Sequence, residues 1–273
     1  MKRDTLIGRT ALAIILAAGL CVAATQALAQ GATPRRANGK PDLTGFWNAA
    51  VGDGIARKGD DESQYATRDG TLESFEDDGQ VLARANTNRP VYKPEHWQTV
   101  RELDWNNGRQ TDPAFSCIFS FPRFNQTPDA IFQTDTHIVL IYSEQNKRRV
   151  FPIDGRKHLE AREFDQTYLG DSIGTWDGDT LVIDTVGFND VTWFKYTGYV
   201  HSNELRVTER IKRDGNVLQY DVTVTDPMLV EPWHMTSAQL RLNTNPEAQV
   251  PEEAPCQEVG GAEAAAAQPN IGR

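Results

Sequence analysis

The sequence lacks most features by which a nucleic-acid partner or a familiar reaction is recognised. Its 28 Lys and Arg against 38 Asp and Glu give a formal net charge of −10. The clearest basic cluster is Lys147-Arg148-Arg149, which is too short to form a basic stripe. An acidic chain without such a stripe does not attract a phosphate backbone, so we expect no nucleic-acid partner. No Walker loop, dinucleotide fingerprint, Gly-x-Ser-x-Gly or haem-attachment sequence occurs, and the five histidines lack zinc-site spacings. We therefore expect neither a cofactor nor a metal.

Long apolar runs are also scarce, and the clearest one lies near the start of the chain. It extends from Ala11 to Ala24, which is short for a membrane helix of roughly 20 residues. Basic residues precede it, and the small-x-small sequence Ala27-Leu28-Ala29 follows it. This order predicts a cleavable signal peptide over residues 1–29. The mature protein would begin at Gln30, would be periplasmic or secreted, and would not be inserted in a membrane.

Two alternatives to a cleaved signal peptide stay open. One is an uncleaved membrane anchor, which the short apolar run disfavours. The other is a lipoprotein modified at Cys21, which the bulky Leu20 before it disfavours.

Cysteine is scarce as well, with three in the chain. Signal removal would leave Cys117 and Cys256, and a remaining pair in an oxidising compartment favours a disulfide. A catalytic cysteine is the less favoured interpretation, because no local signature places a histidine beside either residue.

Composition divides the rest of the chain. Residues 30–41 are small and polar and predict a disordered leader, and residues 245–273 predict a tail rich in Ala, Pro, Glu and Gly. Between them, residues 42–244 predict a single domain. Its first part, residues 42–129, predicts a loop-rich cover with one helix from about Lys93 to Trp105, where Pro94 fits the first turn.

Strand patterns follow one another from Ile131 to Leu242. We expect strands at 137–142, 149–153 and 233–242, and hairpins around the dipeptides Asp177-Gly178 and Asp214-Gly215. Sequential hairpins predict a mainly β fold, an antiparallel up-and-down (lipocalin-like) barrel. A β-sandwich is the alternative.

The second hairpin allows its two faces to be assigned. With Asp214-Gly215 as the turn, Glu209 lies across from Tyr220 on an otherwise apolar face. That face carries Leu205, Val207, Glu209, Ile211, Leu218, Tyr220, Val222 and Val224. A buried carboxylate must be paired, hydrogen-bonded or neutral. Two interpretations stay open: a core Glu bonded to Tyr220 or to an arginine, or a catalytic acid or base with His201 and Asp226 on the same side.

The first hairpin places Asp171 opposite Asp184, where two carboxylates repel each other. They must be splayed into water, be bridged by a cation or share a proton. Aromatic residues supply candidate ligand contacts at Trp176, Trp193, Tyr196 and Trp233, although core packing explains them equally well.

Several motifs resemble those of a group of exported bacterial proteins, most of them uncharacterised. They are DLTGFW (Asp42–Trp47), GDSIGTWDGDTLVIDTVGF (Gly170–Phe188), His201-Ser202, LRVTER (Leu205–Arg210) and Asp226-Pro227. The resemblance covers nearly the whole mature chain and implies no assured activity. More loosely, the two hairpins resemble those of lipocalin-like barrels, which bears on fold rather than function.

These observations predict an exported small-molecule enzyme that works by acid–base chemistry in a barrel cavity. A lyase, isomerase or cyclase acting on an apolar or aromatic substrate suits such a site. The expected catalytic residues are Glu209, His201, Tyr220, Asp184 and Asp171, with Trp176, Trp193, Tyr196, Trp233 and Asp226 in contact with the ligand. The alternatives are a non-catalytic carrier of a small apolar ligand and an envelope interaction protein whose barrel is packed solid.

Overall fold

A computed structural model describes residues 31–49, 64–66, 72–74, 90–103, 113–123, 126–159, 165–195, 199–235 and 237–253. The expected signal peptide, Tyr196 and Cys256 lie outside these ranges, so what was predicted for them stays a prediction. Within the described ranges, no helix is both long and apolar enough to cross a membrane.

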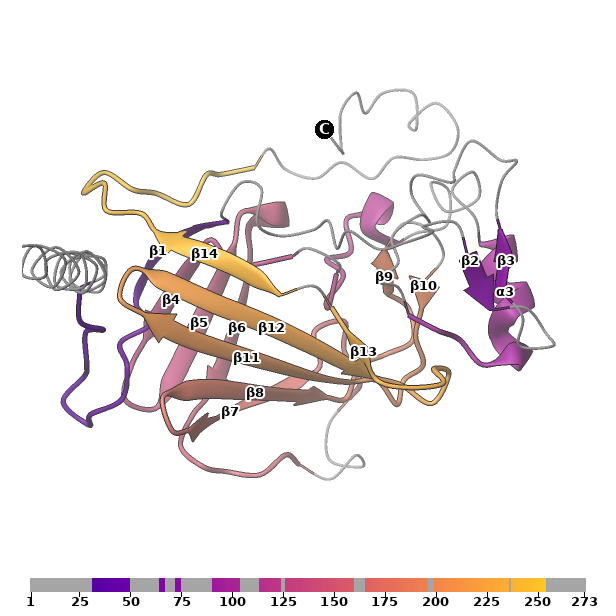
Figure 1. Cartoon of the computed structure of the whole chain (residues 1–273), viewed down its shortest axis with the longest axis horizontal. Coiled ribbons are helices and arrows are strands. Elements are labelled where there is room, and N and C mark those ends of the chain that lie inside the picture. Colours follow the sequence, from indigo (N-terminus) through magenta and orange to yellow (C-terminus); the bar gives the residue numbers. More distant parts are fainter. Residues whose placement is uncertain are drawn as a thin grey trace, which may run out of the picture.

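Ten antiparallel strands form the main sheet (Figure 1). They are β1 (Gly45–Ala49), β4 (Ala130–Gln133), β5 (His137–Tyr142), β6 (Lys147–Pro152), β7 (Asp171–Asp177), β8 (Thr180–Val186), β11 (Arg206–Asp214), β12 (Val217–Thr225), β13 (Trp233–His234) and β14 (Ala238–Leu242). Their order is β6-β5-β4-β1-β14-β12-β11-β8-β7, with β13 also paired to β12. The end strands β6 and β7 approach each other without forming a ladder. The sheet is thus nearly closed, and the expected mainly β barrel is confirmed.

Two small hairpins and four short helical segments complete the described elements. The hairpins pair β2 (Gln64–Ala66) with β3 (Leu72–Ser74) and β9 (Trp193–Lys195) with β10 (Tyr199–Val200). The helical segments are η1 (Pro94–His96), α3 (Trp97–Glu102), η2 (Pro113–Ser116) and η3 (Glu144–Asn146). The expected helix begins at Pro94 as predicted, but its described part ends at Glu102.

The expected N-terminal cover contributes a barrel strand, which the sequence pattern did not reveal. Strand β1 lies between β4 and β14 and carries the inward, buried Trp47. Another part of the cover packs across the barrel end that holds β9 and β10: Tyr92 forms a bridge with Leu229, and its hydroxyl donates to the Val200 carbonyl at 2.6 Å. The prediction of a pure cover over residues 42–129 is therefore wrong for β1.

The expected disordered leader is also wrong for its described residues, 31–41. Arg35 and Pro41 form an isolated β-bridge, and the Arg35 side chain forms an ion pair with Asp179. Small polar composition suggests disorder, but contacts to distant turns of the barrel order this segment.

Both hairpin turns begin one residue later than expected. Asp214 pairs with Val217 and Asp177 with Thr180, so glycine takes the first turn position, where Gly215 has φ 57° and Gly178 has φ 59°. A glycine with positive φ at that position is typical of a type II′ turn. Partners shift by two residues, which leaves every side chain on its predicted face.

The face assignment of the second hairpin is accordingly confirmed. The eight residues predicted to point inward are all buried, with exposed fractions of 8 % or less. The direct partners differ from the prediction, because Glu209 pairs with Val222 instead of Tyr220. In the first hairpin, Asp171 pairs with Val186 and Asp184 with Ile173.

Candidate functional site

Most of the described candidate residues fall into three separate groups. Glu209 and Tyr220 lie inside the barrel, and Asp171 and Asp184 lie on the outer face of β7 and β8. His201, Trp233 and Asp226 lie at the barrel end that residues 90–103 cover. Trp176 belongs to none of these groups, because its ring lies against the Lys40 ammonium, 5.9 Å from it, at the other end.

Glu209 forms a fully buried ion pair with Arg149, a residue that the sequence pattern did not single out. The two guanidinium nitrogens Nη1 and Nη2 donate to Oε1 and Oε2 at 3.0 and 2.7 Å. The Tyr220 hydroxyl donates to Oε1 at 2.5 Å. The Glu209 and Arg149 side chains are 0 % and 2 % exposed, so both oxygens of Glu209 are paired away from water.

Arg149 also reaches three hydroxyl groups and an aromatic ring. Its Nη2 donates to Ser172 Oγ at 2.9 Å and to Thr185 Oγ1 at 3.2 Å, and its Nη1 to the Tyr142 hydroxyl at 3.3 Å. The guanidinium carbon lies 3.7 Å from the centre of the Phe121 ring. We call this group the Arg149 cluster; its members are Arg149, Glu209, Tyr220, Ser172, Thr185, Tyr142 and Phe121. Because Arg149 is on β6 and Ser172 is on β7, the cluster spans the gap where the barrel has no ladder.

Electrostatics keep Arg149 charged and the Tyr142 and Tyr220 hydroxyls neutral. Burial opposes the charge of Arg149, but Glu209 more than offsets it, so the pKa of Arg149 is raised above its ordinary value. Burial and then the charge of Glu209 raise the pKa of the Tyr220 hydroxyl well above its usual range. Burial raises the pKa of Tyr142 to about 12, although Arg149 opposes the rise. These contacts favour the structural interpretation of Glu209 over a catalytic one.

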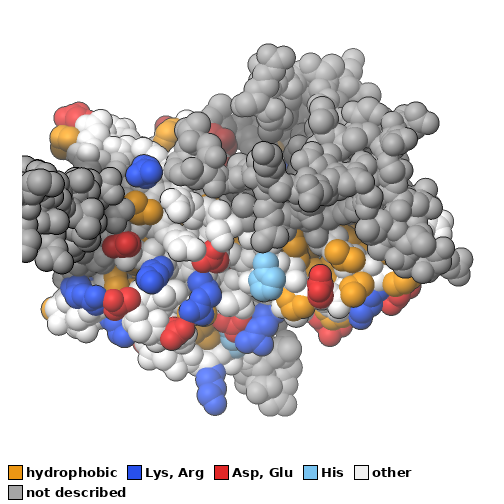
Figure 2. Space-filling view, viewed as in Figure 1, with side chains coloured by type: hydrophobic (Ala, Val, Ile, Leu, Met, Phe, Trp, Pro, Cys, Tyr) orange, Lys and Arg blue, Asp and Glu red, His pale blue; other side chains and the backbone are white. Residues whose placement is uncertain are grey.

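A histidine bridges the two aspartates of the first hairpin. His158 Nδ1 lies 2.7 Å from Asp171 Oδ2, and its Nε2 lies 3.0 Å from Asp184 Oδ2. Arg206 donates to both oxygens of Asp184 at 2.7 Å. Of the three expected outcomes, bridging is the one these contacts favour, with His158 between the two carboxylates and the Arg206 cation on Asp184. Figure 2 shows basic and acidic side chains interspersed over the outer surface of β7, β8 and β11.

This outer group is better suited to fastening than to catalysis. Both ring nitrogens of His158 face carboxylate oxygens, so neither is left for a substrate or a metal ion. Within the described ranges, no group of three or more His, Cys, Asp or Glu side chains could hold a metal. We conclude that His158 fastens residues 154–159 to the sheet.

His201 lies at the covered barrel end and is only 3 % exposed. Its Nδ1 lies 2.9 Å from the Ser202 carbonyl oxygen. Because a carbonyl can only accept, Nδ1 carries the proton, and Nε2 accepts from the Thr192 hydroxyl at 2.8 Å. Burial lowers the pKa of His201 despite the opposing effects of Ser202 and Asp226. The ring is therefore a neutral imidazole with its Nε2 lone pair directed at a hydroxyl.

Aromatic rings surround His201. The ring centres of Phe194 and Phe188 lie 5.2 and 6.2 Å from that of the imidazole, and Trp233 contacts Phe194 at 5.6 Å. Trp193 is also buried. The structure thus joins His201 and Trp233, two of the residues expected from the sequence, in one apolar environment.

Asp226 supports the same end of the barrel through the backbone of Ser202. Its Oδ2 accepts from the Ser202 backbone N–H at 2.9 Å and from the Ser202 hydroxyl at 3.1 Å. Its Oδ1 accepts from the Met228 N–H at 2.8 Å. Since Ser202 supplies the carbonyl that orients His201, Asp226 positions the imidazole indirectly.

The expected partnership of His201 with Glu209 is wrong. The contacts of Glu209 are with Arg149 and Tyr220, whereas those of His201 are with Thr192 and Ser202. Two stacked rings stand between the groups: Phe121 contacts the Arg149 guanidinium and stacks at 6.2 Å on Phe188, which contacts His201. The hairpin pattern correctly predicts that Glu209 points inward, but it does not predict how far His201 lies from Glu209 along the barrel axis.

The chain matches no model of a protein family, no curated protein and no solved structure. A barrel alone is compatible with many functions, so function has to be argued from the geometry of these groups. The resemblance to exported bacterial proteins stays a prediction.

Proposed function

We propose that this protein is an exported enzyme that moves a proton on a small apolar or aromatic substrate, and that His201 is the proton acceptor. The observation that carries the proposal is the chain of contacts from the Thr192 hydroxyl to His201 Nε2 and from His201 Nδ1 to the Ser202 carbonyl. Both ring nitrogens of His201 are engaged, so His201 would act through the Thr192 hydroxyl, which passes its proton to Nε2 as the Thr192 oxygen takes up the proton of the substrate.

The chemistry follows from the charge state of the ring. A neutral imidazole can accept a proton, and the lowered pKa of His201 keeps it neutral at physiological pH. Phe188, Phe194 and Trp233 are buried around His201, so a substrate that reaches His201 would meet apolar rings, which favours a flat, apolar compound. A carbonyl compound with an acidic C–H bond suits this site, and a lyase, isomerase or cyclase reaction begins with removal of such a proton.

Access to His201 requires its cover to move. The segment 91–93 crosses this end of the barrel and is held by backbone hydrogen bonds of 2.9 Å, from Lys93 N to the Met228 carbonyl and from Val230 N to the Val91 carbonyl. The Tyr92 hydroxyl adds its bond to Val200. Tyr92 is also buried and stacks on Tyr199, but the segment has fewer hydrogen bonds than the barrel strands beneath it, so it should open more easily than they do. We place the substrate entrance here.

Proton exchange in heavy water tests the proposal with a panel of candidate compounds. We expect that some cyclic enones or aryl ketones bind, and that the wild-type protein exchanges their acidic C–H for deuterium, which mass spectrometry detects. His201→Gln should keep binding but slow the exchange roughly 100-fold or more, since a positioned base contributes about 10²–10⁴ in rate. Thr192→Val gives a second variant that keeps the shape of the site.

A matched control is available at His234, whose Nδ1 lies 3.0 Å from the Thr223 hydroxyl on an exposed surface. His234→Gln should leave exchange unchanged. Binding without exchange would instead identify the non-catalytic carrier. Exchange that survives His201→Gln, or a complete lack of binding across the panel, would refute the proposal.

Export and the Cys117–Cys256 disulfide form the other part of the proposal. Phe119 contacts Tyr142 with ring centres 5.4 Å apart, and the Asn146 side chain donates to the Glu253 carbonyl at 3.0 Å. Phe119 and Glu253, which are close in sequence to Cys117 and Cys256, thus both contact residues at the turn between β5 and β6. These contacts support the pairing that oxidising export predicts.

Intact mass of the protein recovered outside the cytoplasm checks both expectations. We expect the mass of residues 30–273, lower by the two thiol hydrogens and unchanged by alkylation unless a reductant is present. A mass that retains residues 1–29, or a lipid on Cys21, would contradict export as proposed. Alkylation of Cys117 and Cys256 in freshly purified native protein would contradict the disulfide.

A further inference from the structure

Residues 33–42, here called the strap, cross the barrel end opposite to His201. Backbone hydrogen bonds fold the strap on itself: Arg36 N donates to the Lys40 carbonyl, Gly39 N to the Arg36 carbonyl and Asp42 N to the Pro34 carbonyl, at 2.8–2.9 Å. Apart from Pro41, its side chains are exposed or partly exposed. The strap therefore has a defined shape but contributes little to the core.

The first anchor of the strap is the turn between β7 and β8. Arg35 donates from Nη1 and Nη2 to the two carboxylate oxygens of Asp179 at 2.9 and 2.6 Å. The Lys40 ammonium donates to the Gly178 carbonyl at 3.1 Å. All these groups are exposed, so solvent and salt reach them.

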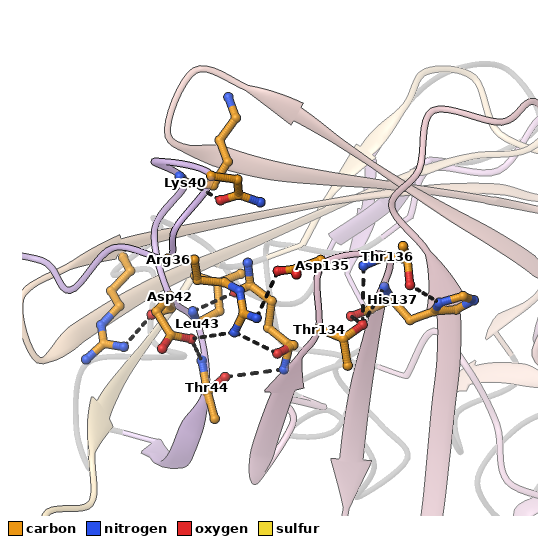
Figure 3. Close-up of polar contacts among 12 residues, drawn as sticks. Arg36, Lys40, Asp42, Leu43, Thr44, Thr134, Asp135, Thr136 and His137 are labelled. Carbon is orange, nitrogen blue, oxygen red and sulfur yellow. Dashed lines mark hydrogen bonds and ion pairs between the residues drawn. The ribbon is translucent and has the colours of Figure 1, made fainter.

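The second anchor is the turn between β4 and β5 (Figure 3). Arg36 donates from Nη1 to the Gln133 carbonyl at 2.9 Å and from Nη2 to Asp135 Oδ1 at 3.0 Å. The Asp135 side chain is 78 % exposed and that of Arg36 is 24 % exposed, so solvent reaches this ion pair from the carboxylate side.

The third anchor is the turn between β11 and β12. The Gly215 N–H donates to the Thr33 hydroxyl at 2.9 Å, and Arg213 Nη1 donates to the Asp42 carbonyl. Arg213 is buried and lies 5.1 Å from the Trp47 ring. One short segment thus ties together three hairpin turns that are far apart in the sequence.

We infer that the strap opens and closes this end of the barrel as a unit, without unfolding the barrel, and that salt favours the open form. The carboxylates of its two ion pairs, Asp179 and Asp135, are 49 % and 78 % exposed, and an exposed ion pair contributes only about 0–1 kcal/mol. Salt screens such pairs, with a Debye length of about 3 Å at 1 M. The barrel strands are joined by ladders and a buried core, so the strap costs less to open than the barrel.

Trypsin provides the test, because Arg35 and Arg36 are cleavage sites only when the strap leaves the barrel. We expect cleavage after these residues to be roughly five- to tenfold faster in about 1 M NaCl than in about 20 mM, since about 1.4 kcal/mol of lost attraction is a factor of ten. The double variant Asp135→Asn/Asp179→Asn keeps both cleavage sites and should be cut rapidly at low salt. Rates are normalised to cleavage of an unstructured peptide.

The matched control is Asp154→Asn, which removes an exposed ion pair within one loop, between Asp154 and Arg156, and should not change cleavage of the strap. Circular dichroism of the cleaved protein should retain the barrel signal. Three results would each overturn the inference: cleavage of the wild-type strap independent of salt, a double variant cut no faster than wild type, or loss of the barrel signal together with cleavage.

Discussion

Arg149→Met should lower the free energy of unfolding by about 3–5 kcal/mol, because it leaves the Glu209 carboxylate buried without its cation. Glu209 is fully buried, and Arg149 pairs with both of its oxygens. Urea denaturation followed by tryptophan fluorescence measures the loss. Glu209→Gln should also destabilise the protein, because it leaves the Arg149 cation without a counter-charge.

Two further variants separate the buried pair from ordinary ion pairing. Arg206→Met removes an equally two-pronged pair with Asp184, but the Arg206 side chain is 59 % exposed, so it should cost less than about 1 kcal/mol. The double change Arg149→Met/Glu209→Leu should recover most of the lost stability, because replacing both partners of a buried pair is often neutral. If Arg149→Met and Arg206→Met lower the free energy of unfolding equally, the buried Arg149 pair stabilises the protein no more than an exposed ion pair does.

Gly170→Ala should lower stability by roughly 2–4 kcal/mol, the sum of a left-handed backbone conformation and a steric clash. Gly170 has φ +65°, and an added Cβ would lie 2.6 Å from the Val186 carbonyl oxygen and 3.2 Å from Phe188 Cζ. Since Phe188 contacts His201, the clash should also broaden or shift the His201 ring signals in NMR spectra.

The control for Gly170→Ala is Gly178→Ala, which has φ +59° and nothing within 4 Å of the added Cβ. It should cost about 1 kcal/mol from the backbone alone. The difference between the two variants measures the clash. If both variants lose the same stability, the close approach of Gly170 to β8 does not constrain the fold.

The strand faces are predictable because side chains alternate with a period of two. An error of one residue in the position of both turns moves partners by two, so Glu209 stays on the inner face with Tyr220. Arg149 escapes prediction for a physical reason. Within Lys147-Arg148-Arg149 the alternation turns Arg149 inward, but its partner lies 60 residues away in the chain, and no local pattern links the two.

The loops are less predictable, because loop residues lack a period. The sequence identifies Asp171 and Asp184 as a repulsive pair, yet the bridging His158 could not be placed from its position after a turn. The strap is expected to be a disordered leader, and its order is missed because it too lacks a periodic pattern. Its small polar residues do suggest disorder, and only the turns of the folded barrel supply the groups that Arg35 and Arg36 bind.

The gap between β6 and β7 also bears on aggregation. Two strand edges that lack a ladder are templates for pairing with other chains, and proteins protect such edges. Here the edges face each other, and Arg149 draws β6 toward Ser172 on β7. Loss of Arg149 would separate them and expose two unpaired edges of the same sheet. We therefore expect Arg149→Met to form β-rich aggregates at temperatures where wild type and Arg206→Met remain dispersed, a hazard that stability alone does not measure.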